Sequence, residues 1–162
     1  MNFYTDYPWE AVRGIDSDGP SIKIGLEELL RGELLCEEQI ELFVDLCRDG
    51  AASTAGYAAI PLLLINDGPS PRLSWQMAHV AGLILIAVGH EGSPPVPFEL
   101  AINVGSEARQ LALKRLLQTA ADAKLGCAEL IDSLAVVMAL LDRNDLANQF
   151  SQIALKEYGV GL

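Results

Sequence analysis

The acidic side chains between residues 37 and 45 are the densest group of reactive side chains in this sequence. They are Glu37, Glu38, Glu41 and Asp45. On a helix, this spacing places the carboxylates on one face, where paired acids can do general acid–base chemistry. A row of acids on an amphipathic helix is more often a solvated surface, or a face that contacts a basic partner. We therefore expect either a solvated surface or a partner-binding face here, with these four residues as the partner-binding candidates, and no enzyme active site.

The histidines and cysteines show no spacing typical of a metal site. The two histidines, His79 and His90, belong to no paired ligand motif with each other or with a cysteine. We expect His79 to be a core histidine and His90 to lie at a helix C-terminus, where a positive imidazole is favoured. Cys36 and Cys47 are three helical turns apart, and like Cys127 they are expected to be small core residues. No metal or cofactor is predicted.

A pocket between helices is the alternative location for chemistry. Tyr57, Trp75, Gln76 and His79 are polar or aromatic groups that could converge on a small molecule, as a carrier or an enzyme would require. Core packing is the simpler interpretation of the same residues. The sequence has no esterase elbow, phosphate loop or dinucleotide motif to support catalysis.

The elements that carry these residues are predicted to be helices. Apolar residues make up 51% of the 162 positions and aromatic residues only 6%, a composition suited to closely packed helices. Apolar periodicity predicts an all-α fold of six to seven helices stacked as antiparallel hairpins. The expected helices span residues 21–31, 35–48, 53–66, 71–89, 98–125, 127–141 and 144–159.

Several helix boundaries follow from local signals. Ser21 can cap the first helix and Gly32 can end it, while Ser70 followed by Pro71 is a strong start signal for the fourth. A third helix over 53–66 would contain Pro61, which removes a backbone hydrogen bond, so either this helix begins later or the proline kink serves the packing. The second helix is expected to bury one apolar stripe, formed by Cys36, Ile40, Phe43, Val44 and Cys47.

The chain is predicted to be a single domain, 1–162, with two irregular segments. Residues 1–20 form an arm that contains Phe3, Tyr4, Tyr7 and Trp9. The arm can fold back as a cap over the first helices, or its aromatics can contact a partner, for which Trp9 is the candidate residue. Residues 90–97 form a connector rich in proline and glycine.

The segment 59–83 resembles a HEAT repeat. It contains Ala-Ile-Pro-Leu-Leu in a first helix, Asp67 near the turn and Arg72 early in a second helix. The turn is longer and richer in proline than the usual pattern, and the match covers about 25 of the 162 residues. The resemblance implies a stacked helical superhelix like that of small bacterial HEAT-like proteins. It also implies that Asp67 and Arg72 bridge successive repeats.

Charge restricts the class of partner. The 22 acids and 11 bases give a net charge of −11, which disfavours nucleic acid and anionic lipid. Residues 1–50 hold 12 acids and 4 bases, so a basic partner would approach this third of the chain.

We expect no leader peptide and no membrane span in this sequence. Met1 to Glu10 is aromatic and acidic, and the longest uncharged stretch, 73–90, contains polar residues and opens with a helix cap. We therefore expect a cytoplasmic protein-binding module. One suitable role is an immunity protein, which neutralises a toxin by covering its catalytic surface.

Overall fold

The computed structural model describes residues 7–87, 103 and 105–159, and these are mostly helical. Seven α-helices lie within the described part, as expected. They are α2 (Gly19–Arg31), α3 (Cys36–Leu46), α4 (Thr54–Ile65), α5 (Pro71–Ala87), α6 (Ser106–Asp122), α7 (Cys127–Leu140) and α8 (Asn144–Glu157). One short 3-10 helix, η1 (Trp9–Ala11), precedes them.

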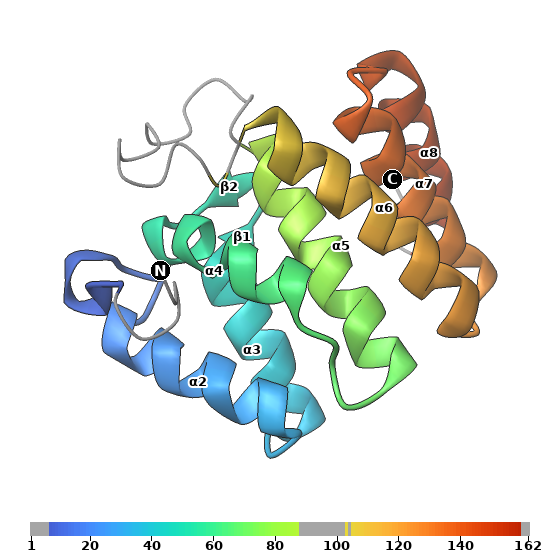
Figure 1. The fold of residues 1–162 in the computed structure, drawn as a ribbon. Coiled ribbons are helices and arrows are strands. Elements are labelled where there is room, and N and C mark those ends of the chain that lie inside the picture. Colours follow the sequence, from blue (N-terminus) through green and yellow to red (C-terminus); the bar gives the residue numbers. More distant parts are fainter. Residues whose placement is uncertain (1–6, 88–102, 104, 160–162) are drawn as a thin grey trace.

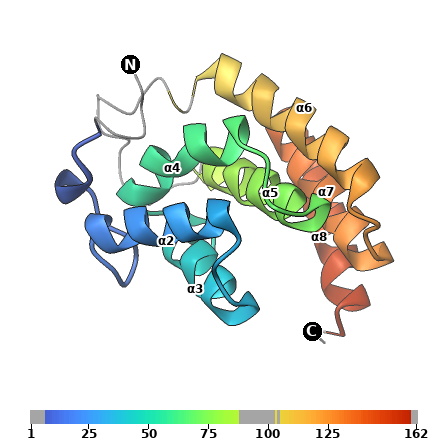
Figure 2. The ribbon, with the colours of Figure 1, turned by 60° about the horizontal axis from the view of Figure 1, so that its bottom comes forward.

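The helices pack mainly against their neighbours in sequence (Figures 1 and 2). α5 is central, since it contacts α4, α6 and α7. α2 and α3 lie at one end of the molecule, and α7 and α8 form a closely packed hairpin at the other. This arrangement gives the molecule two outer ends whose helices have neighbours on one side.

α4 and α5 supply the centre of the core. In α4, every residue except Thr54, Pro61 and Ile65 is buried, so the helix is apolar on nearly all sides. Pro61 lies inside α4 as predicted. The proline is tolerated although it has no amide hydrogen to donate, because the buried side chains around it hold the helix in the core.

The predicted start of α5 and end of α2 are confirmed. α5 begins at Pro71, and the Ser70 hydroxyl accepts a hydrogen bond from the Leu73 amide at 3.2 Å. Gly32 ends α2 in the left-handed conformation, with φ of 74°. The predicted cap of α2 is wrong: α2 begins at Gly19, and the carboxylate of Asp18 accepts from the Ser21 amide at 2.8 Å.

A small β-ribbon between α3 and α4 was not predicted. β1 (Cys47–Arg48) pairs antiparallel with β2 (Ala51–Ala52). Asp49 and Gly50 form the turn, with φ of 52° and 76°. Two consecutive positive φ angles are typical of the tight hairpin turn that Asp-Gly favours. The predicted break at this dipeptide is therefore a hairpin, and helix α3 ends at Leu46 rather than at residue 48.

The inner face of α3 differs from the predicted stripe. The structure buries Leu42, Asp45 and Leu46, and leaves Ile40 and Val44 exposed. α2, α4 and the loop after η1 pack against the face of α3 that contains Leu42 and Asp45, and not against the predicted stripe.

The cysteines do not form the expected set of core residues. Cys36 and Cys127 are exposed, and each is the first residue of a helix. Cys47 is half-buried, and this burial raises the pKa of its thiol to about 11.

Two expectations concern residues beyond those that the structure describes. The connector 90–97, including His90, lies outside the described residues, as do Phe3 and Tyr4 of the arm. Within the predicted helix 98–125, the described residues form α6 from Ser106, with Gly105 at its N-cap.

Candidate functional site

The outer face of α3 carries exposed acidic and apolar side chains side by side. At 100° per residue, Cys36, Glu37, Ile40, Glu41 and Val44 fall within one sector of about 140°, and all five are exposed. Ile40 is 54% exposed and Val44 is 37% exposed. We call these five residues the α3 face. It combines an apolar row with two carboxylates, a composition found at protein interfaces.

Glu38 has a local structural role beside this face. Its side chain is exposed, and Oε2 accepts a hydrogen bond from the Leu35 amide at 2.7 Å. This bond satisfies one of the free amides at the start of α3. Substitutions of Glu38 therefore change the helix start as well as the surface charge.

Asp45 is not part of the exposed face, contrary to the prediction. Its side chain is 6% exposed and accepts hydrogen bonds from the amides of Asp16, at 2.5 Å, and Ser17, at 3.3 Å. The carboxylate thereby fastens the loop after η1 to α3. Gly14 approaches so closely that an added Cβ would lie 2.5 Å from Oδ1 of Asp45. Asp45 is buried because backbone amides replace its water.

Trp9 is also buried, so the prediction of an exposed contact residue is wrong. It is 2% exposed, and η1 packs against α2. Its ring meets that of Tyr7 edge to face, with centroids 5.7 Å apart. The described part of the arm covers the first helices, which is the cap that the sequence allowed.

The residues of the alternative pocket do not converge. Trp75 and His79 lie together on α5, with ring centroids 5.3 Å apart, and both contact α7. Trp75 Nε1 donates to the Ser133 hydroxyl at 2.9 Å, and His79 Nε2 lies 3.3 Å from Oδ2 of Asp132. As expected, His79 is a buried core histidine.

Tyr57 belongs to a different environment. It is fully buried in α4, and burial, together with the nearby thiol of Cys47, raises the pKa of its hydroxyl. Tyr57, Trp75, Gln76 and His79 line neither of the two cavities described below. A small-molecule site at these residues stays a prediction.

Asp67 and Arg72 both form bridges to later helices. Asp67 Oδ1 pairs with Nη2 of Arg115 on α6 at 2.6 Å, and Arg72 pairs with Glu129 on α7. The guanidinium carbon of Arg72 also lies 5.8 Å from the centroid of the Trp75 ring. The α4–α5 hairpin is thus joined to the following helices through two separate ion pairs.

The pKa of the Glu129 carboxyl is lowered in the folded protein. Burial alone would raise its pKa, but the Gly126 amide and the Arg72 guanidinium outweigh burial and lower it. The charged form of Glu129 is therefore favoured in the folded protein.

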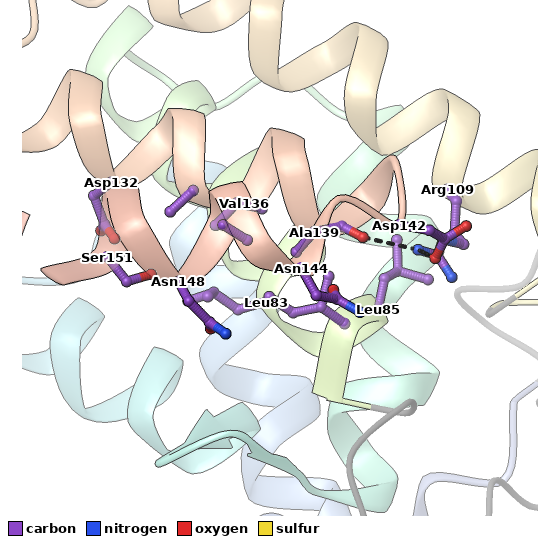
Figure 3. Close-up of a pocket in the computed structure, with 13 residues that line it drawn as sticks. Leu83, Leu85, Arg109, Asp132, Val136, Ala139, Asp142, Asn144, Asn148 and Ser151 are labelled. Carbon is purple, nitrogen blue, oxygen red and sulfur yellow. Dashed lines mark hydrogen bonds and ion pairs between the residues drawn. The ribbon is translucent and has the colours of Figure 1, made fainter.

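A cavity of about 370 Å³ lies among α5, α7 and α8, with Arg109 of α6 at one end (Figure 3). Leu83, Val136 and Ala139 give it apolar walls, and Asn148 and Ser151 of α8 add polar groups. Asp132 lies at the end opposite Arg109 and Asp142. A second cavity, more open, lies between the α4–α5 turn and α6, where Asp67 and Arg115 line it.

The sequence did not single out the first cavity. Neither Arg109 nor Asp132 belongs to a recognisable sequence motif. Their spacing in sequence gives no signal, because α6 and α7 bring them to one cavity only after packing. Across the described ranges, no group of three or more His, Cys, Asp or Glu residues is placed to hold a metal, and no helix is long and apolar enough to span a membrane.

Comparisons with known proteins identify no relative: no family, no curated protein and no solved structure matches this chain.

Proposed function

We propose that this protein is a protein-binding module that docks a basic partner on the α3 face. The observation that supports this is the exposure of Ile40 and Val44 beside Glu37 and Glu41. Large exposed apolar patches rimmed by polar residues mark protein interaction sites, and in this proposal Ile40 and Val44 form the centre of such a site.

Charge and apolar contact would act at different stages of binding. The net charge of −11 attracts a basic protein from a distance and raises its association rate. Close contact then removes water from Ile40 and Val44, and this burial of apolar surface stabilises the complex. The partner that fits is a basic protein with an apolar centre in its contact surface.

An immunity role is the specific form of this proposal. The α3 face would cover the catalytic surface of a basic toxin domain and so block access of its substrate. A HEAT-like stack of hairpins is the architecture we propose behind it. Pro61 inside α4 and the two ion pairs from the α4–α5 hairpin to α6 and α7 support that architecture.

The test is capture of the basic protein encoded by a neighbouring gene. The variant Glu37→Lys with Glu41→Lys reverses two charges on the α3 face and leaves the Glu38 cap intact. The control is Asp122→Lys with Glu157→Lys, which makes the same change in net charge at the exposed ends of α6 and α8. We expect the α3-face variant to lose capture at least 10-fold more than the control.

Salt provides a second readout, since capture by the wild-type chain should weaken as ionic strength rises. Equal losses in the two variants would show an effect of net charge alone. That result, or full capture by the α3-face variant, contradicts the proposal.

A further inference from the structure

The cavity among α5, α7 and α8 has ends of opposite charge. At one end lies Asp132, whose Oδ2 is 3.3 Å from His79 and whose side chain is 35% exposed. At the other end lies Arg109, whose side chain is 32% exposed. Figure 3 shows the two side chains at opposite ends of the row of lining residues. This distribution suits a ligand with a cation at one end and an anion at the other.

Arg109 is held in place for this role. Its Nη2 donates to the carbonyls of Ala139 and Leu140, each at 3.1 Å, and to Oδ1 of Asp142 at 2.8 Å. All of its hydrogen bonds within the described residues therefore use one nitrogen, so Nη1 and Nε keep donors for a ligand. Asp142 is largely exposed, at 81%, and so offsets the guanidinium charge only in part.

The start of α8 adds to the positive end. Asn144, the first residue of α8, lines the cavity, and the preceding Arg143 makes no side-chain capping bond. A helix start without such a cap presents free amides that favour an anion. Arg143 and Asp145, which flank Asn144, pair with each other at 3.5 Å and so largely cancel in charge.

The spacing of the two ends fits a dipeptide. Asp132 and Ala139, whose carbonyl holds Arg109, are seven residues apart on α7, or roughly 10 Å along the helix axis. Two charged hydrogen bonds take about 2.8 Å each, which leaves room for charges several ångströms apart. The terminal ammonium and carboxylate of an extended dipeptide have such a separation, because each residue spans roughly 3.5 Å. The two charged groups of a single amino acid are too close together.

We propose that this cavity binds a short zwitterionic peptide, of dipeptide length, with its ammonium group on Asp132 and its carboxylate on Arg109. Its apolar side chains pack on Leu83, Val136 and Ala139, and the Asn148 amide and Ser151 hydroxyl bond its peptide group. This inference is independent of the α3 face and its partner.

Calorimetric titration of the full chain tests it, with valylvaline as the probe. We expect binding of valylvaline below millimolar concentration, and affinities at least 10-fold weaker for free valine, N-acetyl-valylvaline and valylvaline amide. Tighter binding of 1,4-diaminobutane, equal binding of the blocked peptides, or no binding of valylvaline at millimolar concentration would overturn the proposal.

Variants separate the two ends. Asp132→Asn should weaken valylvaline at least 10-fold but leave the affinity for N-acetyl-valylvaline unchanged, while the control Asp49→Asn, in the exposed β-turn, alters neither. Ser151→Leu should abolish binding by filling the cavity. Thermal unfolding of each variant checks that it folds, and wild-type affinity in folded Ser151→Leu would contradict the location.

Discussion

Helices α3 and α7 begin in the same way, but they are used differently. Each opens with an exposed cysteine, and each has a glutamate at its third position whose Oε2 accepts from the amide before the helix. Glu129 of α7 also pairs with Arg72 of α5, whereas Glu38 forms no ion pair among the described residues. The same type of helix start thus occurs in α3, where its glutamate forms no ion pair within the described part of the chain, and in α7, where its glutamate pairs with α5.

α7 also packs more closely than α3 against a glycine of an earlier helix. A Cβ added at Gly82 of α5 would lie 2.6 Å from Cγ1 of Val136 on α7, while one at Gly25 of α2 would lie 3.2 Å from Cδ1 of Leu42 on α3. Val136 is stiff and buried, but the end of Leu42 can turn aside. The comparison shows that a helix start is determined by residues close in sequence. How closely the helix packs is determined by residues distant in sequence.

Substitution of Gly82 and of Gly25 should show the largest difference in the free energy of unfolding. We expect Gly82→Val to lower the free energy of unfolding by about 3 kcal/mol, because α5 and α7 must separate, and Gly25→Val to lower it by about 1 kcal/mol. Urea unfolding followed by circular dichroism measures both. Equal losses would mean that α7 is docked no more tightly than α3.

Replacement of the two capping glutamates, Glu129 and Glu38, should show a smaller difference in the free energy of unfolding. Glu129→Ala loses both the Gly126 amide bond and the Arg72 pair, so we expect a cost of about 2 kcal/mol. Glu38→Ala loses the Leu35 amide bond alone, at about 1 kcal/mol. If Arg72→Ala removed none of the extra cost in a double-mutant cycle, the cross-link would have no energetic role.

The smallest expected effect is the loss of stability when acid protonates Glu129. The folded pKa of Glu129 lies below its ordinary value of 4.5, so its charged form stabilises the protein above that pH, and the stabilisation is lost as pH falls through the folded pKa. Glu129→Gln should therefore be less stable than the wild type at pH 6 and approach it at pH 3.5. A constant difference in unfolding midpoint at the two pH values would contradict this.

Much of the fold was predictable because it depends on local signals. Ser70 with Pro71, Gly32, and the apolar residues around Pro61 identify helices wherever they occur. The inner face of α3 was not predictable from its apolar residues. The carboxylate of Asp45 is buried and bonded to the amides of Asp16 and Ser17 from a distant loop, while Ile40 and Val44 lie at the surface.

The candidate site was predicted in part. Glu37, Glu38 and Glu41 are exposed, as their polar character indicated, but their apolar neighbours were expected inside. The charged cavity escaped prediction because Arg109 and Asp132 belong to separate helices and make no motif. Whether a partner binds the α3 face stays a prediction.

The exposed cysteines make the molecule convenient for spectroscopy. Cys36 belongs to the α3 face, and Cys127 lies at the start of α7, outside the residues that line the cavity among α5, α7 and α8. A fluorophore attached at each thiol reports from a different end of the protein, without any engineered attachment point.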